Sequence, residues 1–230
     1  MSRDTTALDY PIWHALSTAH AHLALGDDLA KRYPNDLGPL SAIKDQSPEA
    51  YGSLAQLLGP EERAILFLTD LPSPPEGWRI IRCFPMQQMV CDIPPTDDHK
   101  NFEIRTLTVE DVPEMQRLAE ATEPGPFRNR TIELGGYRGI HDDGRLVSMT
   151  GQRLGLTEFT EVSAVCTYPE FRGRGYAGAL VREVAQGIYK QDKTPFLGVK
   201  QDNVNAIRVY EKAGFKIRRM LHVVFLKRPR

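Results

Sequence analysis

The chain has 230 residues, of which 41% are hydrophobic and 26% are charged. This composition is ordinary for a globular protein, and it excludes collagen-like, coiled-coil and intrinsically disordered proteins. A chain of this length buries roughly 70% of its unfolded surface, so its core needs no disulfide or metal for stability. The formal net charge of −1 is unevenly spread, with −11 in residues 1–171 and +10 in residues 172–230. The basic segment indicates an anionic partner, either nucleic acid or a small polyanion, or else a solvated basic face.

Three cysteines, Cys83, Cys91 and Cys166, are too few and too irregularly spaced for a disulfide framework or a zinc site. No run approaches the ~18 apolar residues that a membrane span needs. The N-terminal stretch lacks the basic region and apolar run of a secretory signal. We therefore expect a reduced, cytoplasmic protein with no bound metal and no membrane partner.

The first part of the chain predicts a small α/β unit. The expected elements are a helix over residues 12–30, a helix over residues 48–58 opened by Ser47, a buried strand over residues 64–70, and one or two strands over residues 78–92. The stretch 92–101 holds two prolines and three aspartates without apolar periodicity, which predicts a boundary. We accordingly divide the chain into a small domain, residues 1–98, and a second domain, residues 99–230.

The second segment alternates more clearly between strands and helices. Thr108 and Asp111 form an approximate capping box for a helix that runs to about residue 122. Asp143-Gly144, between two alternating runs, predicts a hairpin turn. The expected elements are strands over residues 102–109, 135–142, 145–154 and 159–168, a helix over residues 176–190, a strand over residues 194–201, a helix over residues 203–213, and a final pair of strands over residues 215–220 and 222–227.

The turn between the strand ending at Tyr168 and the next helix carries the most informative motif, Arg172-Gly173-Arg174-Gly175-Tyr176-Ala177. Its glycines lack Cβ atoms, so backbone amides can approach a ligand closely. The helix N-terminus adds unpaired N–H groups and a partial positive charge, and the two arginines add full charges. The motif therefore predicts a pyrophosphate site. It is neither a P-loop, which needs Gly-Lys-Ser/Thr, nor a Rossmann turn, because it follows the third strand of a meander.

A second motif begins about thirty residues later, directly after a strand. Asn203 can cap the helix, Ala206 and Tyr210 share one helix face at i, i+4 spacing, and Gly214 can end the helix. Taken alone, this helix would give Asn203 a plain capping role and Tyr210 a core role.

Together the two motifs resemble those of the GNAT superfamily of N-acetyltransferases over residues 102–230. The family signature Arg/Gln-x-x-Gly-x-Gly/Ala corresponds to Arg172, Gly175 and Ala177, and the later motif corresponds to Asn203, Ala206, Tyr210, Gly214 and Phe215. The resemblance implies an α/β (α+β) acyl-CoA N-acyltransferase fold, with a mixed, mostly antiparallel sheet and a splayed central strand. The first segment lacks these motifs, and we interpret it as a degenerate half of a similar fold, as in the glycine-acyltransferase-like branch.

The resemblance also implies acetyl-CoA as co-substrate and assigns its contacts. The strand backbone at Val165, Cys166 and Thr167 would pair with the pantetheine arm, the amides from Gly173 to Gly178 would hold the pyrophosphate, and Asn203 would touch the cofactor arm. The complete implied cofactor-binding set is Val165, Cys166, Thr167, Arg172, Gly173, Arg174, Gly175, Tyr176, Ala177, Gly178 and Asn203.

Two side chains are candidates for proton transfer. A lysine-like amine, with a pKa of ~10.4, is almost entirely charged at pH 7, so such an acceptor needs a general base. Glu161 is the candidate base, because some family members carry a carboxylate at this place; the alternative is a solvent-facing glutamate. Strand alternation puts Glu161 on the face of Ser163, Val165 and Thr167, opposite Cys166, so we expect direct attack without an acyl-enzyme. Tyr210 resembles the general acid of the family.

The expected function is therefore acetyl-CoA-dependent N-acetyl transfer, directly onto a primary amine of a small molecule or peptide. Glu123 and Glu133 flank the acceptor-loop region and would favour a cationic amine, unless they are ordinary surface glutamates. The first segment would wall one side of the acceptor pocket or form an oligomer interface, such as that of a homodimer. The alternatives are a non-catalytic acyl-CoA sensor, which needs neither Tyr210 nor a base, and a nucleic-acid binder. We expect no nucleic acid, because Phe215 and Phe225 lie on strand-like runs where burial is favoured.

Overall fold

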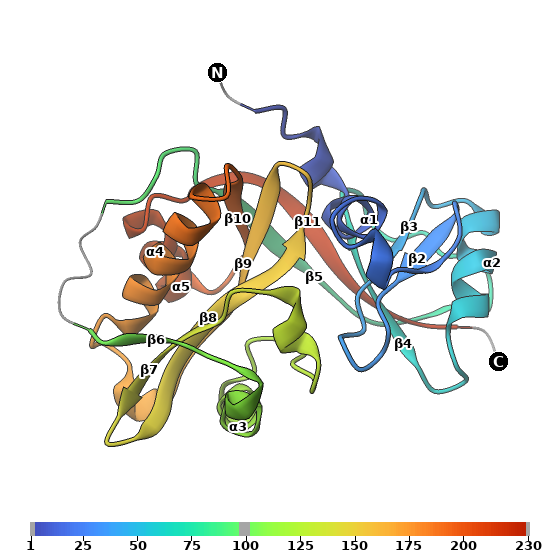
Figure 1. Ribbon diagram of the computed structural model, residues 1–230. Coiled ribbons are helices and arrows are strands. Elements are labelled where there is room, and N and C mark those ends of the chain that lie inside the picture. Colours follow the sequence, from blue (N-terminus) through green and yellow to red (C-terminus); the bar gives the residue numbers. More distant parts are fainter. Residues whose placement is uncertain (1–2, 97–101, 229–230) are drawn as a thin grey trace.

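An eight-stranded sheet forms the centre of the computed structural model, which describes residues 3–96 and 102–228 (Figure 1). In spatial order its strands are β4 (Arg63–Leu68), β11 (Lys216–Lys227), β5 (Arg79–Val90), β10 (Thr194–Lys200), β9 (Phe159–Thr167), β8 (Arg145–Gly155), β7 (Arg138–Asp142) and β6 (Ile104–Thr106). Among these strands only β9 and β10 pair in parallel, and the other pairings are antiparallel. This arrangement confirms the expected mixed, mostly antiparallel sheet.

Helices cover both faces of this sheet. They are α1 (Pro11–Ser17), α2 (Pro48–Leu57), α3 (Val112–Thr122), α4 (Tyr176–Tyr189) and α5 (Val204–Lys212). One core cluster joins α4 and α5 to β5, β9 and β10, while a separate cluster joins α3 to β8 and β9. Helices α4 and α5 therefore lie on one face of β9 and α3 lies on the other (Figure 1).

The first segment of the chain adds a small sheet and part of the large one. The small sheet consists of β1 (Leu25–Gly26), β2 (Ala30–Arg32) and β3 (Ser41–Ile43). Strands β4 and β5 belong to the large sheet, and β5 lies between β10 and β11. The described parts of the two predicted domains thus share one sheet. The boundary predicted between residues 98 and 99 lies outside the described residues.

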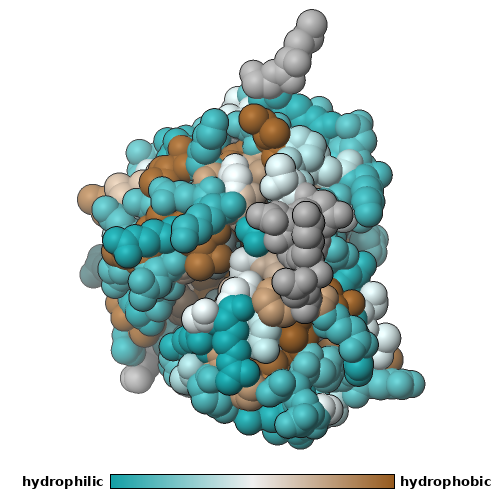
Figure 2. All heavy atoms as spheres, turned by 90° about the vertical axis from the view of Figure 1, so that its left-hand side faces the viewer, coloured by the Kyte–Doolittle hydropathy of each residue, from teal (hydrophilic) through white to brown (hydrophobic). Residues whose placement is uncertain are grey.

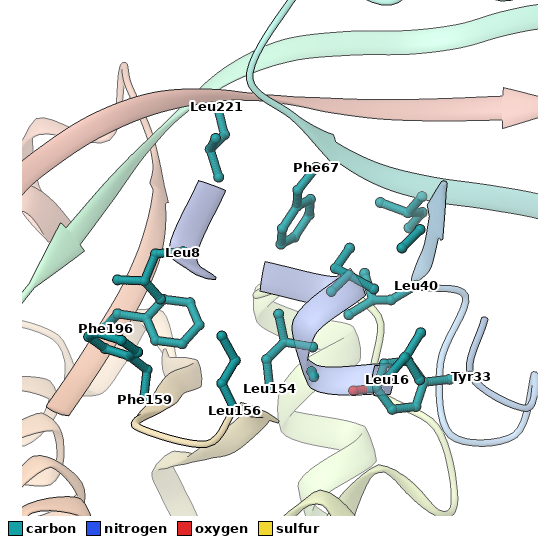
Figure 3. Packing of buried hydrophobic residues seen from close by; sticks show 14 of the residues in the cluster. Leu8, Leu16, Tyr33, Leu40, Phe67, Leu154, Leu156, Phe159, Phe196 and Leu221 are labelled. Carbon is teal, nitrogen blue, oxygen red and sulfur yellow. The ribbon is translucent and has the colours of Figure 1, made fainter. Parts of the chain in front are cut away.

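A core cluster joins the two segments. It combines Leu8 and Tyr33 from the first segment with Phe159, Phe196 and Leu221 from the second, all buried. In Figure 3, Leu8, Phe159 and Phe196 gather at one end of this cluster, and Leu16, Leu40 and Tyr33 gather at the other. The packing therefore fixes the N-terminal segment against the sheet that carries β9 and β10.

Local signals placed most elements correctly. Ser47 Oγ accepts a hydrogen bond from the amide of Ala50 and opens α2 as predicted. Thr108 and Asp111 form the predicted capping box, around a 3₁₀ turn that leads into α3. Asp143 and Gly144 both have positive φ, at 46° and 79°, which is the geometry of a type I′ hairpin turn between β7 and β8.

Two predicted elements are wrong. Residues 12–30 do not form one helix, because α1 ends at Ser17 and strands β1 and β2 follow. Gly26 there has φ +123°, and Asp27 Oδ1 accepts hydrogen bonds from the amides of Leu29 and Ala30, so a turn competes successfully with the helix. The predicted final strand pair is one continuous strand, β11, with a bulge between Ile217 and Arg219. A bulge bends a strand without ending it.

Candidate active site

Strands β9 and β10 separate in the middle of the sheet. They pair only where Thr194–Phe196 meet Phe159–Glu161. Beyond Glu161, β9 pairs with β8 alone and β10 pairs with β5 alone. The sheet therefore opens into a V after Glu161, and along it the β9 backbone facing β10 has no strand partner among the described residues. This is the splayed strand that the resemblance implies, and Val165, Cys166 and Thr167 lie along the part of β9 that has separated from β10.

A bulge in β9 lies inside this V. Met149 pairs with Cys166 and Gly151 with Ser163, so β9 holds one more residue than β8 over this stretch. Ala164, in the bulge, has φ +52°, a conformation that non-glycine residues rarely adopt and that clusters at functional sites.

The bulge overturns the alternation predicted for β9. Val162 and Val165 both pack on the side of α4 and α5, whereas Ala164 and Cys166 pack on the side of α3. The extra residue therefore moves Cys166 to the face of Glu161 and takes Val165 off that face. Tyr137, on the α3 side, is close enough to both Cys166 and Glu161 for each to raise its pKa, after the larger effect of burial.

The arginine–glycine turn has the geometry that an anion site needs. Gly173 and Gly175 have φ +79° and +89°, and Gly175 is the N-cap of α4. The amides from Gly173 to Gly178 donate to no backbone carbonyl among the described residues, and the first bond of the helix runs from Ala179 to Gly175. Successive free amides in this conformation form a concave site for an anion.

The arginines of this turn are exposed. Arg172 Nε donates to the carbonyl of Thr167 at 3.3 Å, and the Arg174 guanidinium lies 4.7 Å from the Phe171 ring centroid. Tyr176, the first residue of α4, packs edge-on against Phe102. The side of the molecule that carries α4 is mainly hydrophilic, with hydrophobic residues exposed in patches (Figure 2). The charges of Arg172 and Arg174 are therefore available to a ligand.

Helix α5 brings the second motif to the V. Asn203 Oδ1 accepts from the amide of Ala206 at 3.1 Å, so Asn203 does cap the helix, and its side chain is exposed. Tyr210 is buried among the residues between α5 and β9. Burial, and to a smaller extent nearby Cys166, raises the pKa of Tyr210 to about 12, so its phenol keeps its proton at neutral pH.

Glu161 is buried and paired. It is 1% exposed, which excludes the solvent-facing alternative. Arg153 of β8 donates to both of its oxygens, from Nη2 at 2.7 Å and from Nε at 2.8 Å. Burial alone would lower the pKa of Arg153, but the carboxylate of Glu161 keeps it raised, so the guanidinium stays charged.

The structure also bears on the roles expected for Cys166, Glu133 and Glu123. Burial raises the pKa of Cys166 to about 12, so its thiol is protonated, which agrees with direct attack. Glu133 is paired with Arg130 at 2.8 Å and brings no free charge to the acceptor side. Glu123 is exposed at the end of α3, with φ +48°.

Sequence reasoning missed Arg153, Tyr33 and Tyr137. They come from three separate parts of the chain, and only the pairing of β7, β8 and β9 and the packing of residues 33–40 bring them together. The signal for Arg153 was its place on the strand next to Glu161, which is visible only when the strand register is known.

Two absences hold within the described ranges 3–96 and 102–228. No helix there is both long and apolar enough to span a membrane. No group of three or more His, Cys, Asp or Glu residues in the same ranges is placed to hold a metal ion.

Comparisons with known proteins agree with this geometry. The FR47-like protein family matches residues 137–224. A solved GNAT-family acetyltransferase structure from Novosphingobium aromaticivorans is 37% identical, with a TM-score of 0.88, over 97% of this chain and 99% of its own. A GCN5-related N-acetyltransferase from Kribbella flavida shares the fold at 15% identity, with a TM-score of 0.64 over 100% of this chain and 97% of its own. A GCN5-related N-acetyltransferase-like protein from Streptococcus suis does so at 13% identity and a TM-score of 0.62, over 95% and 92%. No curated protein matched the chain.

Proposed function

Because this chain belongs to the GNAT superfamily of N-acetyltransferases, we propose that it transfers an acetyl group from acetyl-CoA directly onto a primary amine of a small molecule or peptide. Membership of this family indicates acyl transfer as the class of reaction. The observation that carries the finer proposal is the juxtaposition of the V between β9 and β10, the free amides at the start of α4, and Tyr210 beside Cys166.

In this proposal acetyl-CoA lies along the open side of β9. The backbone at Val165, Cys166 and Thr167 pairs with the pantetheine arm, as a third strand would. The amides from Gly173 to Gly178 hold the pyrophosphate, with Arg172 and Arg174 adding charge. The remaining members of the proposed contact set are Tyr176, Ala177 and Asn203.

The reaction requires one bond to form and one to break. The neutral amine nitrogen attacks the thioester carbonyl carbon, a carbon–nitrogen bond forms, and the carbon–sulfur bond breaks. Tyr210 donates its proton to the departing thiolate and regains one that the amine has lost, so the products are the amide and the free thiol. The raised pKa of Tyr210 keeps this proton in place until the thiolate forms.

For Glu161 the ion pair favours positioning over proton removal. A base must accept a proton, and a protonated Glu161 would leave the buried charge of Arg153 unpaired, which is costly. We therefore assign Glu161 to holding Arg153 in place. The general-base role predicted from the sequence is the alternative, and a pH profile separates the two.

The test uses the purified chain with acetyl-CoA and a panel of primary amines. We expect thiol release that depends on the amine, with the acetylated amine identified by mass spectrometry. Tight binding of acetyl-CoA without acetylation of any amine would establish the non-catalytic sensor instead. Failure to bind acetyl-CoA at all would overturn the proposed cofactor site.

A further inference from the structure

A shallow hollow lies beside Arg153, between residues 33–40 of the first segment and residues 126–134 of the loop after α3. Its walls are mainly apolar, and Arg153 is its charged member. The lining that matters here is Tyr33, Leu37, Leu40, Pro126, Leu134 and Arg153. In Figure 3, Tyr33 and Leu40 lie at the end of the cluster away from Phe159 and Phe196.

The hollow lies close to the place where the proposed acyl transfer occurs. Arg153 lines it and binds Glu161, and Glu161 is three residues before the bulge residue Ala164, or roughly 10 Å along an extended strand. Tyr137 packs over Gly151, which pairs with Ser163 in the bulged region, and Phe127 of the loop packs edge-on against Tyr137 at 5.7 Å. These contacts belong to the α3 face, whereas the turn before α4 serves the opposite face. An acceptor in the hollow would approach the bulge from the side opposite the cofactor.

The polar side chains that line the hollow are Arg153, Tyr33 and Thr131, and the Thr131 hydroxyl is engaged with the carbonyl of Leu37 and the amide of Arg128. Arg153 uses Nε and Nη2 for Glu161, and among the described residues no acceptor takes a hydrogen bond from its Nη1. Arginine carries five N–H donors, so donors remain free. The pair with Glu161 cancels the guanidinium charge, and the Tyr33 hydroxyl is engaged with His20 Nδ1 at 2.8 Å.

We propose that this hollow is the acceptor pocket, and that it takes an amine with an apolar body and a carbonyl or carboxylate oxygen, which Arg153 Nη1 binds. The inference rests on the proposed function and names its substrate class. It departs from the cationic acceptor expected from Glu123 and Glu133, because Glu133 is paired with Arg130 and the hollow itself holds no free carboxylate among its described lining.

The first experiment compares three amines that share one branched apolar body. Leucine carries a carboxylate, leucinamide carries a carbonyl, and 3-methylbutylamine carries neither. Thiol release gives kcat/KM for each, compared per neutral amine. We expect one or both oxygen-bearing amines to exceed 3-methylbutylamine by about tenfold or more, since a hydrogen bond to a charged donor is worth that much. Equal or better turnover of 3-methylbutylamine, or an accepted amine from the wider panel that lacks such an oxygen, overturns the inference.

The second experiment fills the hollow without touching the ion pair. Gly38 lines the hollow, and a Cβ added there would meet no heavy atom within 4 Å. We expect Gly38→Leu to raise KM for the acceptor about tenfold or more while the affinity for acetyl-CoA is unchanged. Gly52→Leu, on α2 and equally free of close neighbours, is the matched control. A Gly38→Leu enzyme with the kinetics of Gly52→Leu would show that the acceptor binds elsewhere.

A third variant separates recognition from folding. Arg153→Lys keeps a cation for Glu161 but removes the planar set of donors. We expect the preference for oxygen-bearing amines to fall toward parity while acetyl-CoA still raises Tm. Arg105→Lys, an exposed arginine paired with Glu103, is the control and keeps the preference. An unchanged preference in a folded Arg153→Lys enzyme contradicts the role of Arg153. If no amine is acetylated by the wild type, the proposed function itself has failed.

Discussion

At the scale of single residues, the buried pair of Arg153 and Glu161 argues against Glu161 as the general base of the proposed reaction. Both carboxylate oxygens are occupied by one guanidinium, and Glu161 is almost fully removed from solvent. Removing one partner of a buried pair costs about 3–5 kcal/mol, because the other charge is left uncompensated. A proton taken up by Glu161 would impose a related cost at every turnover.

For Glu161→Gln we therefore expect a loss in kcat/KM that is constant with pH. If the carboxylate removed a proton from the acceptor, the loss would be largest near neutral pH and would shrink as the amine deprotonates in solution. The measurement is the ratio of wild-type to variant kcat/KM from about pH 6 to about pH 10, a range that spans the pKa of an amine. A loss that shrinks with pH would restore the general-base role.

Tyr210 allows a substitution that removes a single atom. In Tyr210→Phe the ring and its packing against Phe215 remain, so acetyl-CoA affinity should hardly change. The proton for the departing thiolate is lost, and we expect kcat to fall roughly 10²–10⁴-fold at every pH. Pre-steady-state or steady-state thiol release checks this, with acetyl-CoA binding measured in parallel.

Tyr189→Phe serves as the control for Tyr210→Phe. Its hydroxyl donates to the carbonyl of Cys91, so this variant also loses a partly buried phenol, but one away from Cys166. We expect lower Tm with kcat retained. Full activity in Tyr210→Phe would show that Tyr210 serves only as a core residue and not as the general acid.

At the scale of elements, the start of α4 is the part of the site that the sequence describes best. A Val at position 175 would strain the turn, because φ there is +89°, and its Cβ would contact the Phe102 ring at 3.7 Å. In the wild type, acetyl-CoA at 100 times Kd should stabilise the fold by about 2.7 kcal/mol, or roughly 5–10 °C in Tm. We expect Gly175→Val to lose this ligand-dependent shift.

The control for Gly175→Val is Gly187→Val in the same helix, where an added Cβ meets nothing within 4 Å. Its Tm should still rise with acetyl-CoA. Scoring the rise, and not Tm itself, separates loss of binding from the backbone strain that Val introduces at position 175. A normal rise in Gly175→Val would mean that the pyrophosphate lies elsewhere.

The bulge in β9 gives a second prediction at this scale. Ala164 has φ +52°, which glycine adopts freely and a β-branched residue resists. We expect Ala164→Gly to keep the free energy of unfolding within about 1 kcal/mol of the wild type and to leave kcat nearly unchanged. Ala164→Val should lower Tm and reduce turnover, because it strains the strand at the open V. Thermal unfolding and kcat measured on both variants check this. Equal Tm and kcat for the Gly and Val variants would contradict a requirement for positive φ at position 164.

Local signals and long-range pairing account for what the sequence could and could not predict. The cap at Ser47, the Asp143-Gly144 turn and the glycines at 173 and 175 act within a few residues, so their consequences were visible in the sequence. The bulge at Ala164 arises from the pairing of β9 with β8, and no local signal in the sequence predicts it. An alternation argument across it consequently placed Cys166 on the wrong face.

At the scale of the whole molecule, the proposed site draws on both segments of the chain. The recognisable motifs lie within residues 102–230, yet residues 33–40 line the hollow beside Arg153. The sequence offers a prediction for the cofactor side because one turn and one helix contain the motifs. It could not predict the hollow, because that site exists only after the first segment has packed against β8 and β9.

Strand β5 makes the two segments interdependent. It pairs with β10 on one side and with β11 on the other, so a fragment of residues 101–230 loses the strand between them. We expect that fragment to lack cooperative unfolding and to show no shift with acetyl-CoA, while co-expression with residues 1–100 restores both. Circular dichroism during heating, with and without acetyl-CoA, is the measurement. A fragment that unfolds cooperatively and binds acetyl-CoA would establish the second segment as an independent domain.

The large separation in sequence between paired strands also bears on how the protein is made. Strands β4 and β5 are synthesised well before β11, with which both of them pair. Translation at about 5–20 residues per second leaves roughly 6–25 s between the completion of Val90 and the arrival of Lys216. During that interval β4, which is mostly apolar, lacks β11, its neighbour in the large sheet as far as the structure describes it. We therefore expect a product that ends shortly before β11 to aggregate, because β4 and β5 would expose unpaired edges, and light scattering of that product would measure this.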